Sequence, residues 1–236
     1  TANEQAGQNA NADGKGKESN QEQVLKLNNE NEPTSFDPPI GFNNVSWQAL
    51  NNLMEGLTRL GADHEPEAAS AEKWSISDDG KTYTFTIRGQ AKWSNGDPLT
   101  AGDFEYAWKR LLDPKTGSSA AFLGYVIEGG EEFNNGKGSK DDVKVEALND
   151  KTLKVTLTSP QKSFLSIVSN PAFFPVNQKV AEGNPKWHEE ADTFVGNGPF
   201  KLTEWKHDES LAMEKSDTFW DKKTVKLDKV TWAMVN

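Results

Sequence analysis

Three histidines are the residues of this sequence best suited to bind a metal or to transfer a proton near neutral pH. His64, His188 and His207 lie far apart in the chain. Carboxylates follow two of them, in His64-Glu65-Pro66-Glu67 and in His188-Glu189-Glu190. Neither stretch has the two histidines on one helical face that a zinc hydrolase uses. We therefore predict no metal site and interpret both stretches as solvated polar surface.

Nucleophilic catalysis has no candidate residue in this sequence. The chain contains no cysteine, which excludes thiol catalysis, thiolate zinc sites and disulfides. It also lacks the Gly-x-Ser-x-Gly turn that presents a catalytic serine. A pair of carboxylates for glycoside hydrolysis depends on their separation in space. With 36 acidic residues a chance pair carries little weight. We predict no catalytic residue and keep a hydrolase with an unrecognised carboxylate pair as an alternative.

A glycine-containing stretch raises the question of phosphate binding. Gly129, Gly130, Gly136 and Gly138 lie close together, but no Gly-Lys-Ser/Thr sequence follows them and no clear strand precedes them. We interpret the stretch as a surface loop and predict no cofactor.

Composition excludes further classes of function. Lys and Arg number 26 against 36 Asp and Glu, a net charge of -10, so nucleic acid is a poor partner for this chain. No apolar run approaches the ~20 residues of a membrane-spanning helix. Aromatic residues make up 10% of the chain, including eight Trp. They fit a packed core, an aromatic-lined cleft or a carbohydrate-binding module, and an exposed coplanar row of Trp would favour the last.

Any binding residues must be positioned by a mixture of strands and helices. Thr100, with Asp103 three residues later, predicts a capped helix over residues 100–112, and Phe104, Trp108 and Leu111 share its apolar face. A second helix is predicted over residues 46–57, with Trp47, Leu50, Met54 and Leu57 on one face, and a short one over 164–168. Residues 117–138 are predicted as loop-rich, with little periodicity after Phe122.

Strands outnumber these helices. Alternating apolar residues predict strands over 24–27, 200–205, 210–213 and 227–234, and hairpins around Asp79-Gly80 and Asn149-Asp150. Strands and helices interspersed in this way indicate an α+β fold with mixed sheets. Residues 1–23 contain no Val, Ile, Leu, Met or aromatic residue, so we expect a disordered polar tether there.

Several ordered motifs resemble one protein family. Residues 92–108 read Lys-Trp-Ser-Asn-Gly-Asp-Pro-Leu-Thr-Ala-Gly-Asp-Phe-Glu-Tyr-Ala-Trp, and this stretch looks like the signature of bacterial oligopeptide- and dipeptide-binding proteins, the extracellular solute-binding proteins of family 5. Further stretches in the family's order are Thr34-Ser35-Phe36-Asp37-Pro38, Met54-Glu55-Gly56-Leu57, Val195-Gly196-Asn197-Gly198-Pro199-Phe200 and Ser216-Asp217-Thr218-Phe219-Trp220. Together they cover residues 24–236, which makes the resemblance specific.

The resemblance implies a fold like that of type II periplasmic binding proteins. Its first lobe is discontinuous and maps to residues 24–54 plus 174–236, and an inserted smaller α+β domain maps to residues 55–173. Family members are much longer, and their second ligand-binding lobe follows the region of Val230-Thr231-Trp232. We therefore expect this chain to be the N-terminal part of a clamp that lacks its second lobe.

The implied function is capture of a peptide and its delivery to the permease subunits of an ABC transporter, without enzymatic activity. The implied location is the periplasm or the extracellular face of the membrane, with the residues at 1–23 leading from a lipid anchor absent from this chain. Nickel complexes, haem and sugars stay alternative ligands, because related proteins take them up.

The resemblance also implies ligand-binding residues. In the family an extended segment pairs with the peptide backbone as an added strand, and the matching residues are Phe42, Asn43, Asn44 and Val45. The same segment also fits a plain loop in which Asn44 or Ser46 caps the next helix.

A second candidate is Gly196-Asn197-Gly198, whose glycines allow positive φ or a close backbone approach. In the family it lies near the cleft and the hinge, and a structural turn is the alternative. The acid that pairs with the peptide amine in the family lies in the absent lobe, so we expect this chain to bind peptides weakly or undetectably. We also expect an unpaired strand edge near residues 230–235 to favour self-association.

Overall fold

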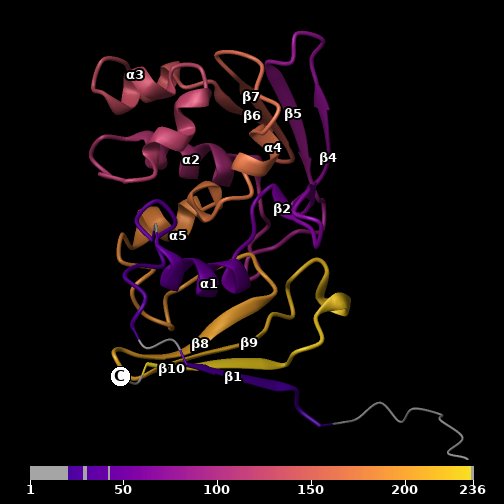
Figure 1. Cartoon of the computed structure of the whole chain (residues 1–236), viewed down its shortest axis with the longest axis vertical. Coiled ribbons are helices and arrows are strands. Elements are labelled where there is room, and N and C mark those ends of the chain that lie inside the picture. Colours follow the sequence, from indigo (N-terminus) through magenta and orange to yellow (C-terminus); the bar gives the residue numbers. More distant parts are fainter. Residues whose placement is uncertain (1–20, 29–30, 42, 235–236) are drawn as a thin grey trace, which may run out of the picture.

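The computed structural model describes residues 21–28, 31–41 and 43–234 of the chain (Figure 1). The predicted tether therefore lies almost entirely outside the described residues, as does Phe42. Of the tether, Gln21, Glu22 and Gln23 are described, and all three are exposed. The backbone N–H of Gln23 donates to Asp228 Oδ2 at 2.8 Å, so the last residue of the predicted tether already contacts the folded part.

One four-stranded sheet joins the two ends of the described chain. Its strands lie in the order β1-β10-β9-β8, and β1 runs parallel to β10 whereas the other neighbours are antiparallel. The bounds are β1 Val24–Asn28, β8 Phe200–Lys206, β9 Ser210–Lys215 and β10 Lys229–Ala233. All four strands were predicted. The expected unpaired edge at β10 is wrong, because β1 covers it from residue 24 to residue 28 and leaves β1 and β8 as the edges.

A second four-stranded sheet is built from two hairpins. The order is β4-β5-β7-β6, and all neighbours are antiparallel. The bounds are β4 Ala71–Ile76, β5 Thr82–Ile87, β6 Val145–Asn149 and β7 Thr152–Thr156, and a separate pair consists of β2 Thr58–Leu60 and β3 Pro66–Ala68. Both predicted hairpins are confirmed. Tyr83, Phe85 and Ile87 are buried on β5 and alternate with half-buried threonines, so one face of this sheet meets the core.

Helix α2, Ala101–Leu112, covers that face (Figure 1). The predicted capping box is present, since Thr100 accepts from the Asp103 N–H and Asp103 accepts from the Thr100 N–H. Trp108 is completely buried, and its Nε1 donates to the carbonyl of Phe173 at 2.9 Å. The predicted helix and its buried face are therefore confirmed.

The other helices are short: α1 Asn44–Leu53, α3 Gly130–Asn134, α4 Phe164–Ile167 and α5 Gln178–Gly183. Two predictions are corrected here. Helix α1 begins two residues earlier and ends four residues earlier than predicted, because Met54 is extended, with φ -142° and ψ 163°. Residues 117–138 contain α3 and a 3-10 helix, Ala121–Val126, rather than only loop.

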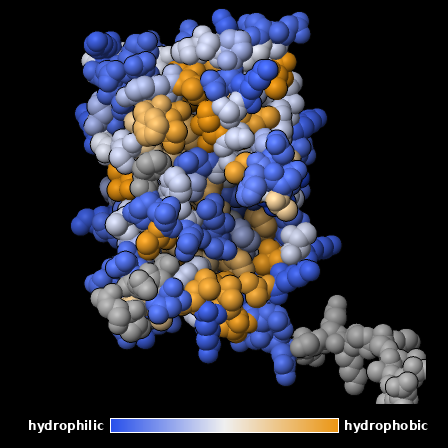
Figure 2. All heavy atoms as spheres, viewed as in Figure 1, coloured by the Kyte–Doolittle hydropathy of each residue, from blue (hydrophilic) through white to orange (hydrophobic). Residues whose placement is uncertain are grey.

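The buried side chains form one continuous apolar cluster that runs through both sheets. In Figure 1, α1 lies between the sheet β1-β10-β9-β8 and the part of the molecule built on β4 to β7. Figure 2 shows a largely hydrophilic face on which apolar side chains gather over the lower sheet and among the upper helices. The mixed α+β class is confirmed. The sheet β1-β10-β9-β8, at the bottom of Figure 1, uses residues 24–28 and 200–233, and the sheet β4-β5-β7-β6 uses residues 71–156. The domain borders predicted near residues 54 and 173 stay a prediction.

Candidate ligand-binding site

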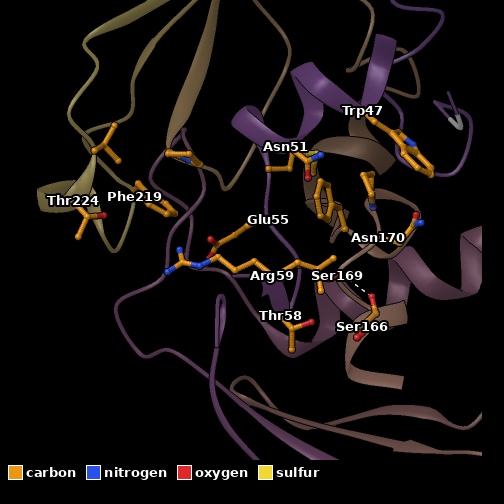
Figure 3. Close-up of a pocket in the computed structure, with 17 residues that line it drawn as sticks. Trp47, Asn51, Glu55, Thr58, Arg59, Ser166, Ser169, Asn170, Phe219 and Thr224 are labelled. Carbon is orange, nitrogen blue, oxygen red and sulfur yellow. Dashed lines mark hydrogen bonds between the residues drawn. The ribbon is translucent and has the colours of Figure 1, made fainter. Parts of the chain in front are cut away.

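A groove of about 690 Å³ opens where α1, β2 and α4 approach the segment that precedes β10 (Figure 3). It is lined by residues of the stretches 47–60, 166–174 and 219–225, together with Pro199. The walls combine large apolar side chains, among them Trp47 and Phe174, with the amides of Asn51 and Asn170. Most small-molecule sites have 300–1,000 Å³ and this mixture of apolar walls and a few polar groups.

A buried carboxyl group forms part of the groove's floor. Glu55 is 7% exposed, and its Oε1 accepts from Trp220 Nε1 at 2.6 Å and from Ser70 Oγ at 2.9 Å. Burial raises the pKa of Glu55 to about 7, and these two hydrogen bonds oppose the rise only in part. The carboxyl group therefore exchanges its proton near neutral pH.

Trp220 holds one wall of the groove to this floor. The guanidinium of Arg88 stacks on its ring, with Cζ 3.6 Å from the ring centroid. Arg88 Nε in turn donates to the carbonyl of Ala69 at 2.6 Å. The indole is thus fixed on one side by a cation and on its edge by Glu55, and the lining residues Phe219, Thr224 and Val225 lie just before and just after it in the chain.

Asn197 is placed beneath the groove rather than in it. Its Oδ1 accepts from the Glu55 N–H at 3.1 Å, and its Nδ2 donates to the Glu55 carbonyl at 3.0 Å and to Ser70 Oγ at 3.3 Å. It is 3% exposed and absent from the groove lining. The Asn197 side chain thus takes the place of the backbone groups that the N–H and carbonyl of Glu55 would bond if the helix continued, which explains why α1 ends at Leu53.

The glycines beside Asn197 allow two backbones to touch. A Cβ on Gly196 would lie 2.1 Å from the Leu53 carbonyl oxygen, and one on Gly198 would lie 2.4 Å from Met54 N. Neither has positive φ, so close approach is the reason for glycine here. The structure gives Gly196, Asn197 and Gly198 a structural role, and a direct ligand contact stays a prediction.

The other predicted segment lies at the start of α1. Asn43 caps the helix, since its Oδ1 accepts from the Ser46 N–H at 2.9 Å. Asn44 and Val45 form the first turn of α1, which corrects the prediction of an extended segment through Val45 and of Asn44 or Ser46 as the cap. Among the described residues of this segment, Asn43 is the extended one, and its N–H donates to the Gly41 carbonyl. Trp47, in the same helix, reaches the groove. Peptide binding by Asn43, Asn44 and Val45 stays a prediction.

Sequence reasoning missed Glu55 on the groove floor and its partner Trp220, which does not itself line the groove. Glu55 and Trp220 occur in two of the quoted motifs, yet they lie 165 residues apart and only the fold brings them together. A charged residue between the apolar Met54 and Leu57 was the available signal, because buried acids are rare unless they are paired or functional.

The histidines have separate environments. His207 contacts Glu32 at 2.9 Å and Glu190 at 3.2 Å on the surface, whereas His188 is 18% exposed and lies 3.9 Å from Asp37. The interpretation of the His188 stretch as plain solvated surface is therefore corrected for His188 itself. Among the residues that the structure describes, no three His, Asp or Glu side chains are placed to hold a metal ion.

Comparison with known proteins identifies the class. The family described as "Bacterial extracellular solute-binding proteins, family 5 Middle" matches residues 65–236. The chain therefore belongs to the bacterial extracellular solute-binding proteins of family 5, as its motifs indicated.

Particular relatives and structures agree with this class. The chain is 75% identical, over its whole length, to the dipeptide-binding protein DppE of Bacillus subtilis, of which it spans 43%. It is 50% identical to the oligopeptide-binding protein OppA of the same species, over 98% of this chain and 42% of that protein. The structure of Listeria monocytogenes OppA bound to peptide matches with a TM-score of 0.88 and 37% identity, over 91% of this chain and 43% of the other. The predicted type II fold is thereby confirmed for this chain, which spans less than half of these proteins.

Proposed function

We propose that this chain forms one wall of an extracytoplasmic peptide-binding site, and that the protein hands its peptides to the permease subunits of an ABC importer. It acts as a carrier, without catalytic residues or a cofactor. It works in the periplasm or at the extracellular face of the membrane, held there in the latter case by a lipid anchor. None of the described helices combines the length and the apolar character needed to cross a membrane.

The groove is the observation that carries this proposal. Its apolar walls, Trp47, Phe174 and Phe219, suit the side chains of a peptide, and the amides of Asn51 and Asn170 suit its backbone (Figure 3). A site that pairs with the backbone and holds side chains in apolar recesses can accept many sequences. A single wall buries only part of a ligand, so binding by this chain is weak.

A carbohydrate-binding module is less well supported. All eight Trp residues fall in the described part of the chain, and each is buried or half-buried. Trp93, Trp108, Trp187 and Trp232 are 3% exposed or less and belong to the core. An exposed coplanar row of Trp, which would favour carbohydrate, is not formed by these side chains.

Titration of the chain with short peptides, followed by amide proton–nitrogen correlation spectra, tests the proposal. We expect binding with a Kd on the order of 1 mM, and perturbed resonances confined to the groove. Mass spectrometry of ligands that copurify from the native source separates peptides from haem, nickel complexes and sugars.

A pair of variants on the exposed side of α1 sharpens this test. Asn51→Trp places an indole in the groove and should abolish binding. Gln48→Trp adds the same ring at an exposed residue of the same helix that does not line the groove, and should leave binding unchanged. Perturbations far from the groove, or equal binding by both variants, would contradict the assignment.

A further inference from the structure

This inference rests on the proposed function and concerns which peptides the groove prefers. We propose that Arg59 is a specificity residue of this groove and binds a carboxylate of the peptide ligand. Arg59 lies on β2, four residues after Glu55, and both line the groove. In Figure 3 its guanidinium points toward Glu55 and the segment that carries Phe219 and Thr224.

The charge of the groove differs from the charge of the chain. The chain has a net charge of -10. Of the described residues that line the groove, only Glu55 and Arg59 carry ionisable side chains. Glu55 is buried and engaged by Ser70 and Trp220, whereas the Arg59 side chain is 46% exposed. The exposed charge that an entering ligand meets is therefore the positive charge of Arg59.

The guanidinium still has free donors. Within the described part of the chain, its one ion pair joins Arg59 Nε to Glu67 Oε1 at 2.6 Å. The two terminal Nη groups keep the fork that binds both oxygens of a carboxylate. Glu67 is 49% exposed, and such a solvated pair contributes little stability. It orients the guanidinium without using up its charge.

A peptide can supply this carboxylate from its C-terminus or from an acidic side chain. The test compares three peptides that share a free amine: tri-alanine, tri-alanine amide, and the amide of Ala-Glu-Ala. Their affinities are measured by the same correlation spectra. We expect the unmodified chain to bind tri-alanine about tenfold more tightly than its amide, the effect of one charge-assisted fork. Recovery of affinity by Ala-Glu-Ala amide assigns Arg59 to acidic side chains, and lack of recovery assigns it to the C-terminus.

Four variants connect the preference to Arg59. Arg59→Gln should remove the difference in affinity between tri-alanine and its amide. Arg59→Lys should keep part of this difference, because lysine supplies a point charge without the fork. Glu67→Gln removes the competing carboxylate and should widen the difference. Lys109→Gln removes one cation from α2, away from the groove, and should leave the difference unchanged. Thermal unfolding of each variant shows whether it remains folded.

The outcomes separate the two proposals. Equal binding of all three peptides by the unmodified chain, or a preference for a carboxylate that persists in Arg59→Gln, overturns the role of Arg59 while peptide binding stands. Failure of all three peptides to perturb the spectra at about 10 mM, where a Kd of 1 mM would give near saturation, overturns the proposed function and this inference with it.

Discussion

Trp220 Nε1 donates to Glu55 Oε1 at 2.6 Å across 165 residues of sequence. The bond joins the segment that ends α1 to the segment that follows β9, and both line the groove. Glu55 is buried and its pKa is about 7. Its protonation near neutral pH therefore changes the acceptor of the hydrogen bond that holds Trp220, and with it the groove wall formed by the neighbouring residues.

Stability should therefore fall as pH rises through the range set by Glu55. Its pKa is 4.5 in the reference state and about 7 in the fold, so between these values the folded chain holds a proton that the unfolded chain has released. Stability is then greatest below the unfolded pKa and decreases by about 3 kcal/mol as pH rises through the folded pKa. Urea unfolding at a series of pH values measures this slope, and Glu55→Gln should flatten it.

His207 titrates in the same direction and needs a control. Partial burial lowers its pKa, but the charges of Glu32 and Glu190 outweigh this and raise it. The comparison is best made in a His207→Gln background. An unchanged pH slope in Glu55→Gln would show that Glu55 is ionised throughout.

Trp108→Ala should cost roughly 3–5 kcal/mol of unfolding free energy, the usual range for a buried large aromatic. The ring packs edge-on against Phe104, Phe164 and Phe173, and its removal leaves the Phe173 carbonyl without the indole donor. Leu148→Ala, at a side chain that is 57% exposed, is the matched control and should change stability by less than about 0.5 kcal/mol. A loss below about 1 kcal/mol for Trp108→Ala would place the ring outside the core.

Gly196→Ala and Gly198→Ala should each destabilise the chain by about 1–3 kcal/mol or more, because the added methyl groups meet backbone atoms of Leu53 and Met54. Gly183→Ala is the control, since nothing lies within 4 Å of its added Cβ and the residue ends α5. It should be neutral or slightly stabilising. Thermal unfolding compares the three. Equal effects would mean that the contact between the Asn197 segment and the end of α1 is loose.

Arg110→Met should cost about 3–5 kcal/mol, because it leaves a buried carboxylate without its partner. Arg110 donates from both terminal nitrogens to Asp37, at 2.9 and 2.7 Å, and the Asp37 side chain is 5% exposed. Asp37→Asn combined with Arg110→Met removes both charges and should recover much of the loss. Urea unfolding of the single and double variants gives the coupling. If the losses in unfolding free energy of the two single variants simply add up in the double variant, Asp37 and Arg110 do not interact directly.

The sequence predicted best what is settled by neighbouring residues. The capping box of Thr100 and Asp103 and the two hairpin turns need only contacts within a few residues, and all three are present. Residues 92–108 also identified the family. Local patterns of this kind decide where an element begins and which face it buries.

Features that depend on distant residues were predicted less well. Helix α1 ends early because Asn197, 142 residues further along, takes both backbone groups of Glu55. Apolar spacing continued to Leu57 and carried no sign of this competition. The groove was missed for the same reason, since its walls come from three separate stretches of the chain.

The parallel pairing of β1 with β10 has a consequence for the order of folding. Val24 pairs with Lys229, so closing this sheet joins residues 205 positions apart, and contacts of such separation form slowly. During synthesis β1 emerges 205 positions ahead of its partner, and it must wait for that length of chain before the pair can form. Residues 24–28 are therefore the last of the described strands to dock. Val24, Leu25 and Leu27 are each still 40% exposed in the folded chain, so they offer an apolar segment to chaperones or to another copy of the chain both before and after docking.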